Sequence, residues 1–118
     1  MKYFLLSFAF LIECISMNAQ SDSYMQQSKS YQHEAEYYTK QAQGYDKEFY
    51  YYNRQAQGFL REAEYCSKQE KFERVKNFQR RAKVATEKAE SYKQKADYAR
   101  EKAKAYMRKA EQALDKVR

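Results

Sequence analysis

The chain has 118 residues and a net charge of +7, with thirteen Tyr and seven Phe but only two Gly, no Pro and no Trp. That length allows at most one small domain, and the shortage of Gly and Pro leaves few residues suited to turns. Its apolar residues are mainly Ala and Tyr rather than Leu, Ile and Val, which excludes a thick multilayer core. We therefore expect long, uninterrupted helices that bury a narrow seam.

Residues 1–19 are the most hydrophobic part of the chain. Lys2 supplies a positive n-region, an apolar run follows it, and Ala19 is a small residue suited to signal cleavage. The run is too short to span a bilayer, which needs about 20 apolar residues. We therefore predict a signal peptide at 1–19 and a mature chain, 20–118, exported to the periplasm, the cell envelope or the exterior.

Two alternatives to cleavage stay open. Cys14 could carry a lipid, although Glu13 stands where a lipidation signal needs a small residue. The segment could also remain as an uncleaved anchor. Cleavage would leave Cys66 as the one cysteine of the mature chain, and an odd thiol in an oxidising compartment is a candidate for an intermolecular disulfide.

The chain contains two families of fourteen-residue repeats. Residues 38–51 align without gaps on residues 52–65, and residues 24–37 fit the same frame more loosely. In the second half, residues 82–95 and 96–109 form a repeat of their own. A fourteen-residue period is two heptads and predicts a coiled coil.

Each half shows a 3-4 apolar repeat, which is typical of a coiled-coil seam. In the first half the a positions are Ser28, Ala35, Ala42, Phe49, Ala56 and Ala63, and the d positions are Tyr24, Tyr31, Tyr38, Tyr45, Tyr52, Phe59 and Cys66. In the second half the a positions are Val75, Ala82, Ala89, Ala96, Ala103, Ala110 and Val117, and the d positions are Phe78, Ala85, Tyr92, Ala99, Tyr106 and Ala113.

The two heptad frames are out of phase by two residues, a shift that coiled coils do not absorb by local rewinding. We therefore predict an all-α, antiparallel two-helix coiled-coil hairpin with an Ala/Tyr seam, able to assemble into a larger helical bundle. Helix 1 is expected at about 23–65, the turn at about 66–68 and helix 2 at about 69–117. The alternative is one long helix that pairs antiparallel with a second copy.

Capping signals favour the turn. Ser67 with Glu70 forms a capping box that would open helix 2, and Ser23 with Gln26 would open helix 1. No Gly follows helix 1, which counts against a turn there.

Two registers fit the hairpin. In the Phe49–Ala85 register, Tyr52 faces Ala82 and nearly every layer sets one large residue against one small residue. In the Phe49–Tyr92 register, which is shifted by one heptad, two large rings share a layer. Close packing favours the Phe49–Ala85 register.

The g positions of the two helices flank each other in an antiparallel pair. Helix 1 offers Gln27, Glu34, Gln41, Glu48, Gln55 and Glu62, and helix 2 offers the basic row Arg74, Arg81, Lys88, Lys95, Lys102 and Lys109. We expect most of these cations to act in intramolecular pairing rather than in binding nucleic acid or membranes.

Two other surfaces are candidates for function. A Tyr/Gly flank at the c positions offers ridges and notches for self-association or for another helical protein, and comprises Tyr37, Gly44, Tyr51, Gly58, Tyr65, Val84 and Tyr98. A basic ridge on the back of helix 1 could bind nucleic acid, lipopolysaccharide, an anionic glycan or a membrane surface, and comprises His33, Lys40, Lys47, Arg54 and Arg61. A solvated face and copying by repeat duplication are the plainer interpretations of these patterns.

Catalysis finds little support. One His, one mature Cys, no Gly-rich phosphate loop and no His pair at metal-ligand spacing predict no enzyme, no cofactor, no metal site and no small-molecule substrate. The leading hypothesis is a non-enzymatic, exported coiled-coil structural or interaction protein that self-associates. The alternatives are a binder of anionic polymers or membrane surfaces, and a holdase-like or lipid-carrying amphipathic protein.

Overall fold

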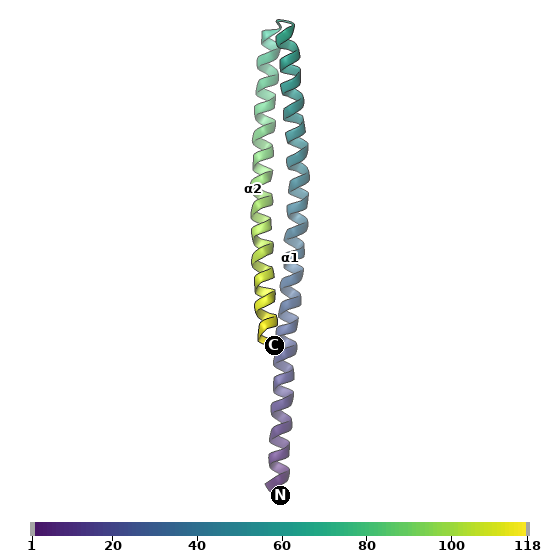
Figure 1. Cartoon of the computed structure of the whole chain (residues 1–118), viewed down its shortest axis with the longest axis vertical. Coiled ribbons are helices and arrows are strands. Elements are labelled where there is room, and N and C mark those ends of the chain that lie inside the picture. The colour runs from purple at the N-terminus through teal and green to yellow at the C-terminus, as the bar shows by residue number, and fades with distance from the viewer. Residues whose placement is uncertain (1, 118) are drawn as a thin grey trace. The chain divides into compact units, whose positions relative to one another are not determined.

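The computed structural model describes the backbone of residues 2–117 and the side chains of residues 20–117. It contains two α-helices, α1 (Lys2–Lys68) and α2 (Phe72–Val117), and no strand within the described backbone. The helices run in opposite directions away from a tight turn (Figure 1). The predicted all-α helical hairpin is therefore confirmed, and a single long helix is excluded because residues 69–71 leave the helix.

The chain divides into two compact units, each formed by a segment of α1 and a segment of α2. The turn unit comprises Tyr38–Glu101, and the terminal unit comprises Met1–Tyr37 with Lys102–Arg118. The predicted signal peptide and Cys14 lie outside the residues whose side chains are described, so cleavage and lipidation stay predictions. Within the described residues, no helical segment is long and apolar enough to cross a membrane.

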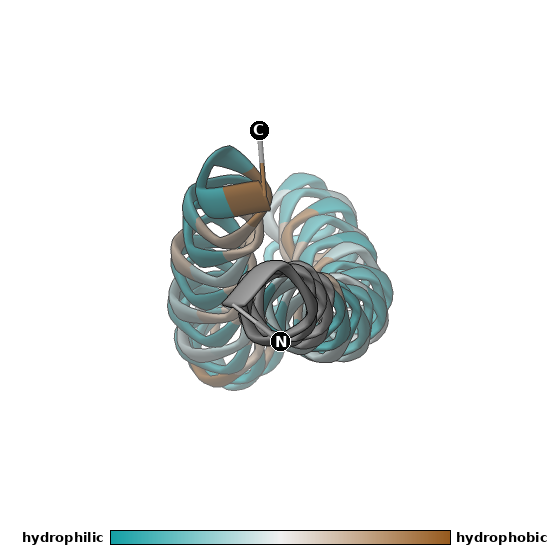
Figure 2. Ribbon diagram, turned by 90° about the horizontal axis from the view of Figure 1, so that it is seen from below, coloured by the Kyte–Doolittle hydropathy of each residue, from teal (hydrophilic) through white to brown (hydrophobic). Residues whose placement is uncertain are grey.

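The seam is composed of the predicted a and d positions in both units. Every one of these residues is buried or half-buried, with small side chains innermost: Ala96 is 0% exposed and Ala99 is 1% exposed. The seam tyrosines are only half-buried. Much of the ribbon is teal or pale in Figure 2, because hydrophobic residues are a minority in this chain.

The turn is a Schellman motif at the C-terminus of α1. The Lys71 N–H donates to the Cys66 carbonyl at 2.9 Å and the Glu70 N–H donates to the Ser67 carbonyl at 3.1 Å. Glu70 has a φ of 60°, in the left-handed region usually occupied by Gly. The Lys71 carbonyl then accepts from the Val75 N–H at 3.1 Å, which begins α2.

The predicted element boundaries therefore need correction. The turn lies at residues 69–71 rather than 66–68, because α1 continues to Lys68. The capping box of Ser67 and Glu70 is wrong, since Ser67 is helical and Glu70 ends α1 instead of starting α2. The expected helix start near residue 23 lies inside α1, which begins at Lys2.

The preferred register is also wrong. In the turn unit the rings of Tyr52 and Tyr92 stack with centroids 5.7 Å apart. The Phe49–Ala85 register would place Tyr92 opposite Ala42, ten residues or about 15 Å along α1 from Tyr52. The Phe49–Tyr92 register places Tyr92 about one helical turn from Tyr52, as observed.

The displaced turn explains the shift. Moving the centre of the turn by three residues moves the partner of each α1 residue by about one heptad along α2. The terminal unit has the same register: Lys109 lies over Tyr31 and Lys116 lies over Tyr24, each cation being next to the α2 residue that faces that tyrosine.

Candidate interaction face

The predicted Tyr/Gly flank is exposed along the turn unit. Tyr51 is 54% exposed, Tyr65 is 58% exposed, and Val84 and Tyr98 of α2 are also exposed. Gly44 and Gly58 occupy the intervening c positions of α1. Tyr37, the remaining member, belongs to the terminal unit and is exposed there.

Within the described residues, close packing does not require a glycine at either c position. A Cβ placed on Gly44 or on Gly58 would meet no heavy atom within 4 Å. Each glycine costs a helix about 1 kcal/mol relative to alanine. The hairpin therefore carries a helix-weakening residue at two equivalent positions, Gly44 exposed and Gly58 half-buried, where its own packing would accept a methyl group.

The tyrosines of this flank are held in a repeated geometry. Gln55 Nε2 donates to the Tyr51 hydroxyl at 2.8 Å, and Gln69 Nε2 donates to the Tyr65 hydroxyl at 2.7 Å. Both pairs are separated by four residues, and the second is the first moved by fourteen. The repeat in sequence is thus a repeat in side-chain hydrogen bonding.

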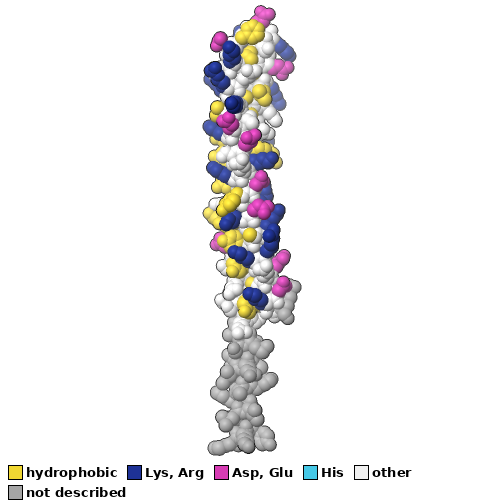
Figure 3. Space-filling model, turned by 90° about the vertical axis from the view of Figure 1, so that its left-hand side faces the viewer, with side chains coloured by type: hydrophobic (Ala, Val, Ile, Leu, Met, Phe, Trp, Pro, Cys, Tyr) yellow, Lys and Arg dark blue, Asp and Glu magenta, His cyan; other side chains and the backbone are white. Residues whose placement is uncertain are grey.

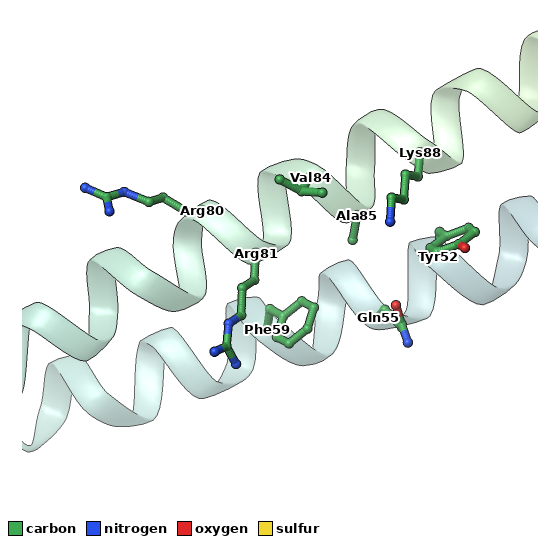
Figure 4. A pocket seen from close by; sticks show the side chains of 8 residues that line it. All are labelled: Tyr52, Gln55, Phe59, Arg80, Arg81, Val84, Ala85 and Lys88. Carbon is green, nitrogen blue, oxygen red and sulfur yellow. The ribbon is translucent and has the colours of Figure 1, made fainter.

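An open groove lies beside this flank, between α1 and α2 (Figure 4). Groove 1 has a volume of about 350 Å³ and is lined by Tyr52, Gln55, Phe59, Arg80, Arg81, Val84, Ala85 and Lys88. Its floor is apolar, its rim carries three cations, and no acidic side chain lines it. Groove 2 lies farther from the turn and is lined by Gln41, Tyr45, Ser91, Gln94, Lys95, Tyr98 and Ala99.

A third groove lies next to the turn and is lined by Glu62, Tyr65, Cys66, Lys71, Arg74, Asn77, Phe78 and Arg81. Hydrophobic, basic and acidic side chains are interspersed on the side of the molecule drawn in Figure 3. Groove 1, with its apolar floor and three cations, suits a partner that is both apolar and acidic.

The basic g row of α2 does act within the chain, but mostly not through the expected ion pairs. Lys88 Nζ lies 5.5 Å from the ring centroid of Tyr52, across the seam, and Lys95 Nζ lies 5.1 Å from that of Tyr92. Arg81 lies over Phe78 at 5.7 Å. These are cation–π distances, which let a lysine cover an aromatic ring while its charge stays solvated. The sequence predicts pairing of this row with the Gln/Glu row of α1, whereas the observed contacts are with aromatic rings. The Tyr residues at the d positions are the sequence feature from which these contacts could have been predicted.

One interhelical ion pair lies outside the predicted g rows. Arg100 Nη1 lies 2.7 Å from Asp46 Oδ2 across the turn unit, and Arg100 Nη2 lies 2.9 Å from Asp97 Oδ1. Hydrogen bonds to Asp46 and then Asp97 raise the pKa of Arg100. Asp46 and Arg100 both occupy e positions, which lie beside the seam. A heptad assignment in the correct register would have predicted this pair.

The predicted basic ridge is exposed as expected. Lys40, Lys47, Arg54 and Arg61 are exposed in the turn unit, and His33 is exposed in the terminal unit. Within residues 20–117, none of the five forms an ion pair. Their seven-residue spacing places the four cations of the turn unit in one row on the outer side of α1.

Cys66 is a free, buried thiol at the last seam position of α1, with 5% of its surface exposed. An intermolecular disulfide at Cys66 would need the end of the hairpin to open. The described residues contain no cluster of three or more His, Cys, Asp or Glu side chains able to hold a metal ion.

Comparison with models of known protein families, with curated proteins and with solved structures gave no match. The surface that combines exposed aromatic rings, unexplained glycines and cation-rimmed grooves is the side of the turn unit that carries the Tyr/Gly flank.

Proposed function

We propose that this chain is an exported, non-catalytic interaction protein whose helical hairpin binds a second copy through the Tyr/Gly flank. The observation that carries the proposal is the open space around Gly44 and Gly58 between exposed tyrosines. A glycine retained at such cost in a helix is accounted for by the close approach of another backbone. Tyrosines suit such contacts because each has an apolar ring and a polar hydroxyl.

The narrow seam supports the same proposal. A two-helix pair with alanines at its centre buries little apolar surface for its length, so a lone hairpin is expected to be marginally stable. Association would add burial on the flank and raise the unfolding temperature.

The test is the dependence of stability on concentration. For a self-associating hairpin, the thermal midpoint measured by circular dichroism should rise with protein concentration over a roughly hundredfold range. Sedimentation equilibrium over the same range should give a mass above that of the monomer. A constant midpoint together with a monomer mass at every concentration would refute self-association.

We propose export on the strength of Lys2, the apolar run that follows it and Ala19. Intact-mass analysis of the protein from the extracellular or envelope fraction should give a chain that begins at or near Gln20. A mass that corresponds to a lipid on Cys14 would establish lipidation instead, and an intact chain confined to the cytosol would refute export.

A second candidate function is binding of an anionic polymer by the basic ridge. It is supported by the exposure of Lys40, Lys47, Arg54 and Arg61 and by their regular spacing. Retention on a heparin column should then fall steeply with salt, because bound counterions are released. Replacing Lys47 and Arg54 by Ser should abolish this retention, whereas replacing two cations of α2 outside the ridge should leave most of it.

A further inference from the structure

Groove 2 is groove 1 moved by one fourteen-residue repeat. On α1 the shift takes Gln55 to Gln41 and Phe59 to Tyr45, and on α2 it takes Arg81 to Lys95, Val84 to Tyr98 and Ala85 to Ala99. Both grooves thus have an aromatic floor, a buried alanine, a glutamine and a cation in matching places. Their separation is fourteen residues, or about 21 Å along a helix.

Exposed tyrosines on the same side of the hairpin, here called knobs, have the same fourteen-residue period. Tyr51 and Tyr65 are exposed, are fourteen residues apart, and each follows an exposed glutamate by three residues, Glu48 and Glu62. Residues three apart are neighbours on a helix surface, so each tyrosine stands beside a carboxylate. Within residues 20–117 neither glutamate forms an ion pair.

The two grooves and the two Glu–Tyr knobs are complementary in charge as well as in spacing. Groove 1 is rimmed by Arg80, Arg81 and Lys88, and groove 2 by Lys95, and no acidic residue lines either. An acidic side chain beside an aromatic ring would place the ring on the apolar floor and the carboxylate at the cationic rim. A self-complementary patch of this kind is what a two-fold dimer requires.

We propose that two copies pack face to face, with the Glu48–Tyr51 and Glu62–Tyr65 pairs of each α1 seated in grooves 1 and 2 of the other copy. This inference rests on the proposed self-association and specifies its surface. Gly58 lies between the two tyrosines and has open space around it, so the partner backbone can approach there.

Charge exchange tests this arrangement without knowledge of its atomic detail. The basic-knob variant carries Glu48→Lys and Glu62→Lys, and the acidic-groove variant carries Arg81→Glu and Lys95→Glu. Alone, each variant would set like charges against each other at every knob, so its dimer dissociation constant should rise at least about tenfold. Mixed, basic knobs meet acidic grooves and acidic knobs meet basic grooves, so a heterodimer of near wild-type affinity should form.

Two matched control variants carry the same changes in net charge, but at b positions on the outer sides of the helices. One control variant carries Glu36→Lys and Glu64→Lys, and the other carries Lys76→Glu and Lys83→Glu; all four residues are exposed. Each should keep its own self-association, and mixing should give no comparable gain. General attraction between oppositely charged chains would instead act on both sets of variants alike.

Sedimentation equilibrium of labelled chains and far-ultraviolet circular dichroism separate the outcomes. A monomeric wild type would refute the proposed function itself. A dimeric wild type whose basic-knob and acidic-groove variants dimerise as well as the controls would overturn only this arrangement. If either variant unfolds alone, recovery of helix on mixing supports the arrangement, and failure to recover overturns it.

Discussion

Tyr52 of α1 and Tyr92 of α2 stack across the seam with their ring centroids 5.7 Å apart and their planes within 5° of parallel. Tyr45 reaches the same ring from the other side, at 6.2 Å. Tyr92 therefore lies between two tyrosines of the facing helix that are one heptad apart. Phe49 and Tyr92, which share a layer in this register, are both only half-buried.

Disulfide trapping should report this register. In a Cys66→Ser background, Ala42→Cys with Ala99→Cys places two thiols in one seam layer, within reach of the roughly 4.4–6.8 Å between Cα atoms that a disulfide needs. Oxidation at high dilution should give a crosslinked monomer, seen as a mobility shift that reduction reverses. The control pair, Ala42→Cys with Tyr92→Cys, should close more slowly, and faster closure of the control would restore the Phe49–Ala85 register.

Glu70→Gly should stabilise the hairpin. Glu70 has a φ of 60°, and a residue with a Cβ in this region costs about 1 kcal/mol or more relative to Gly. We expect the free energy of unfolding in urea to rise by about 1 kcal/mol. Gln69→Gly is the control, since no positive φ is found there, and it should give no gain. Equal effects of the two substitutions would contradict the Schellman turn.

Ionisation of Tyr52 should lower the stability of the hairpin at alkaline pH. Burial, followed by the neighbouring Tyr92, Glu48 and Tyr51, raises the pKa of Tyr52 above its ordinary value of 10.0. The unfolded chain therefore loses this proton at lower pH than the folded chain. The contribution is fully present below pH 10 and is lost as the pH rises through the folded pKa.

Tyr52→Phe removes this dependence and provides the comparison. The stability of the wild type relative to the variant, measured by urea titration, should fall as the pH rises above about 10. A difference that is constant with pH would show that Tyr52 ionises equally in both states.

Gly44→Ala and Gly58→Ala should separate helix stability from association. At high dilution each substitution should raise the free energy of unfolding by up to about 1 kcal/mol, because alanine favours helix and its methyl group meets nothing. At high concentration the same methyl groups should weaken the dimer. Gln57→Ala, at a position outside the flank, should change helix stability alone. Sedimentation equilibrium of all three variants distinguishes these effects, and unchanged dimerisation by the glycine variants would remove the main support for the flank.

Asp46→Asn should cost little. The Arg100–Asp46 pair has a short distance of 2.7 Å, but side-chain exposures of 44% and 35% leave it well solvated. Exposed pairs contribute about 0.2–1 kcal/mol, and salt screens them. We expect a loss within that range in dilute buffer that largely disappears in about 1 M salt. Asp97→Asn, which breaks the pair within α2, should cost less because it does not join the two helices.

The sequence was sufficient to predict which residues form the seam. A 3-4 spacing of Ala and Tyr leaves one stripe on each helix to bury, so residues such as Ala42, Ala89 and Ala96 had no alternative position. The chain reversal was predicted from the two-residue shift between the two heptad frames.

The place of the turn could not be read in the same way. A position with left-handed backbone is usually occupied by Gly, whereas here it is occupied by Glu70. The hydrogen bonds of the Schellman motif join backbone atoms only, so no side-chain pattern predicts them. The register then followed the misplaced turn. On the candidate face, the flank was predicted from periodicity, but the grooves depend on the register and so could not be placed.

The Schellman turn also determines the order in which contacts can form during folding. Its hydrogen bonds join residues already close in the chain, so the loop that must close first is short and its entropic cost is small. Within the turn unit, Phe59 can meet Phe78 next, then Tyr52 can meet Tyr92, and the Asp46–Arg100 pair, whose residues are 54 apart, comes later. Folding should therefore proceed like a zipper from the turn. Substitutions near Cys66 and Phe78 should slow folding, whereas substitutions near Asp46 should mainly speed unfolding.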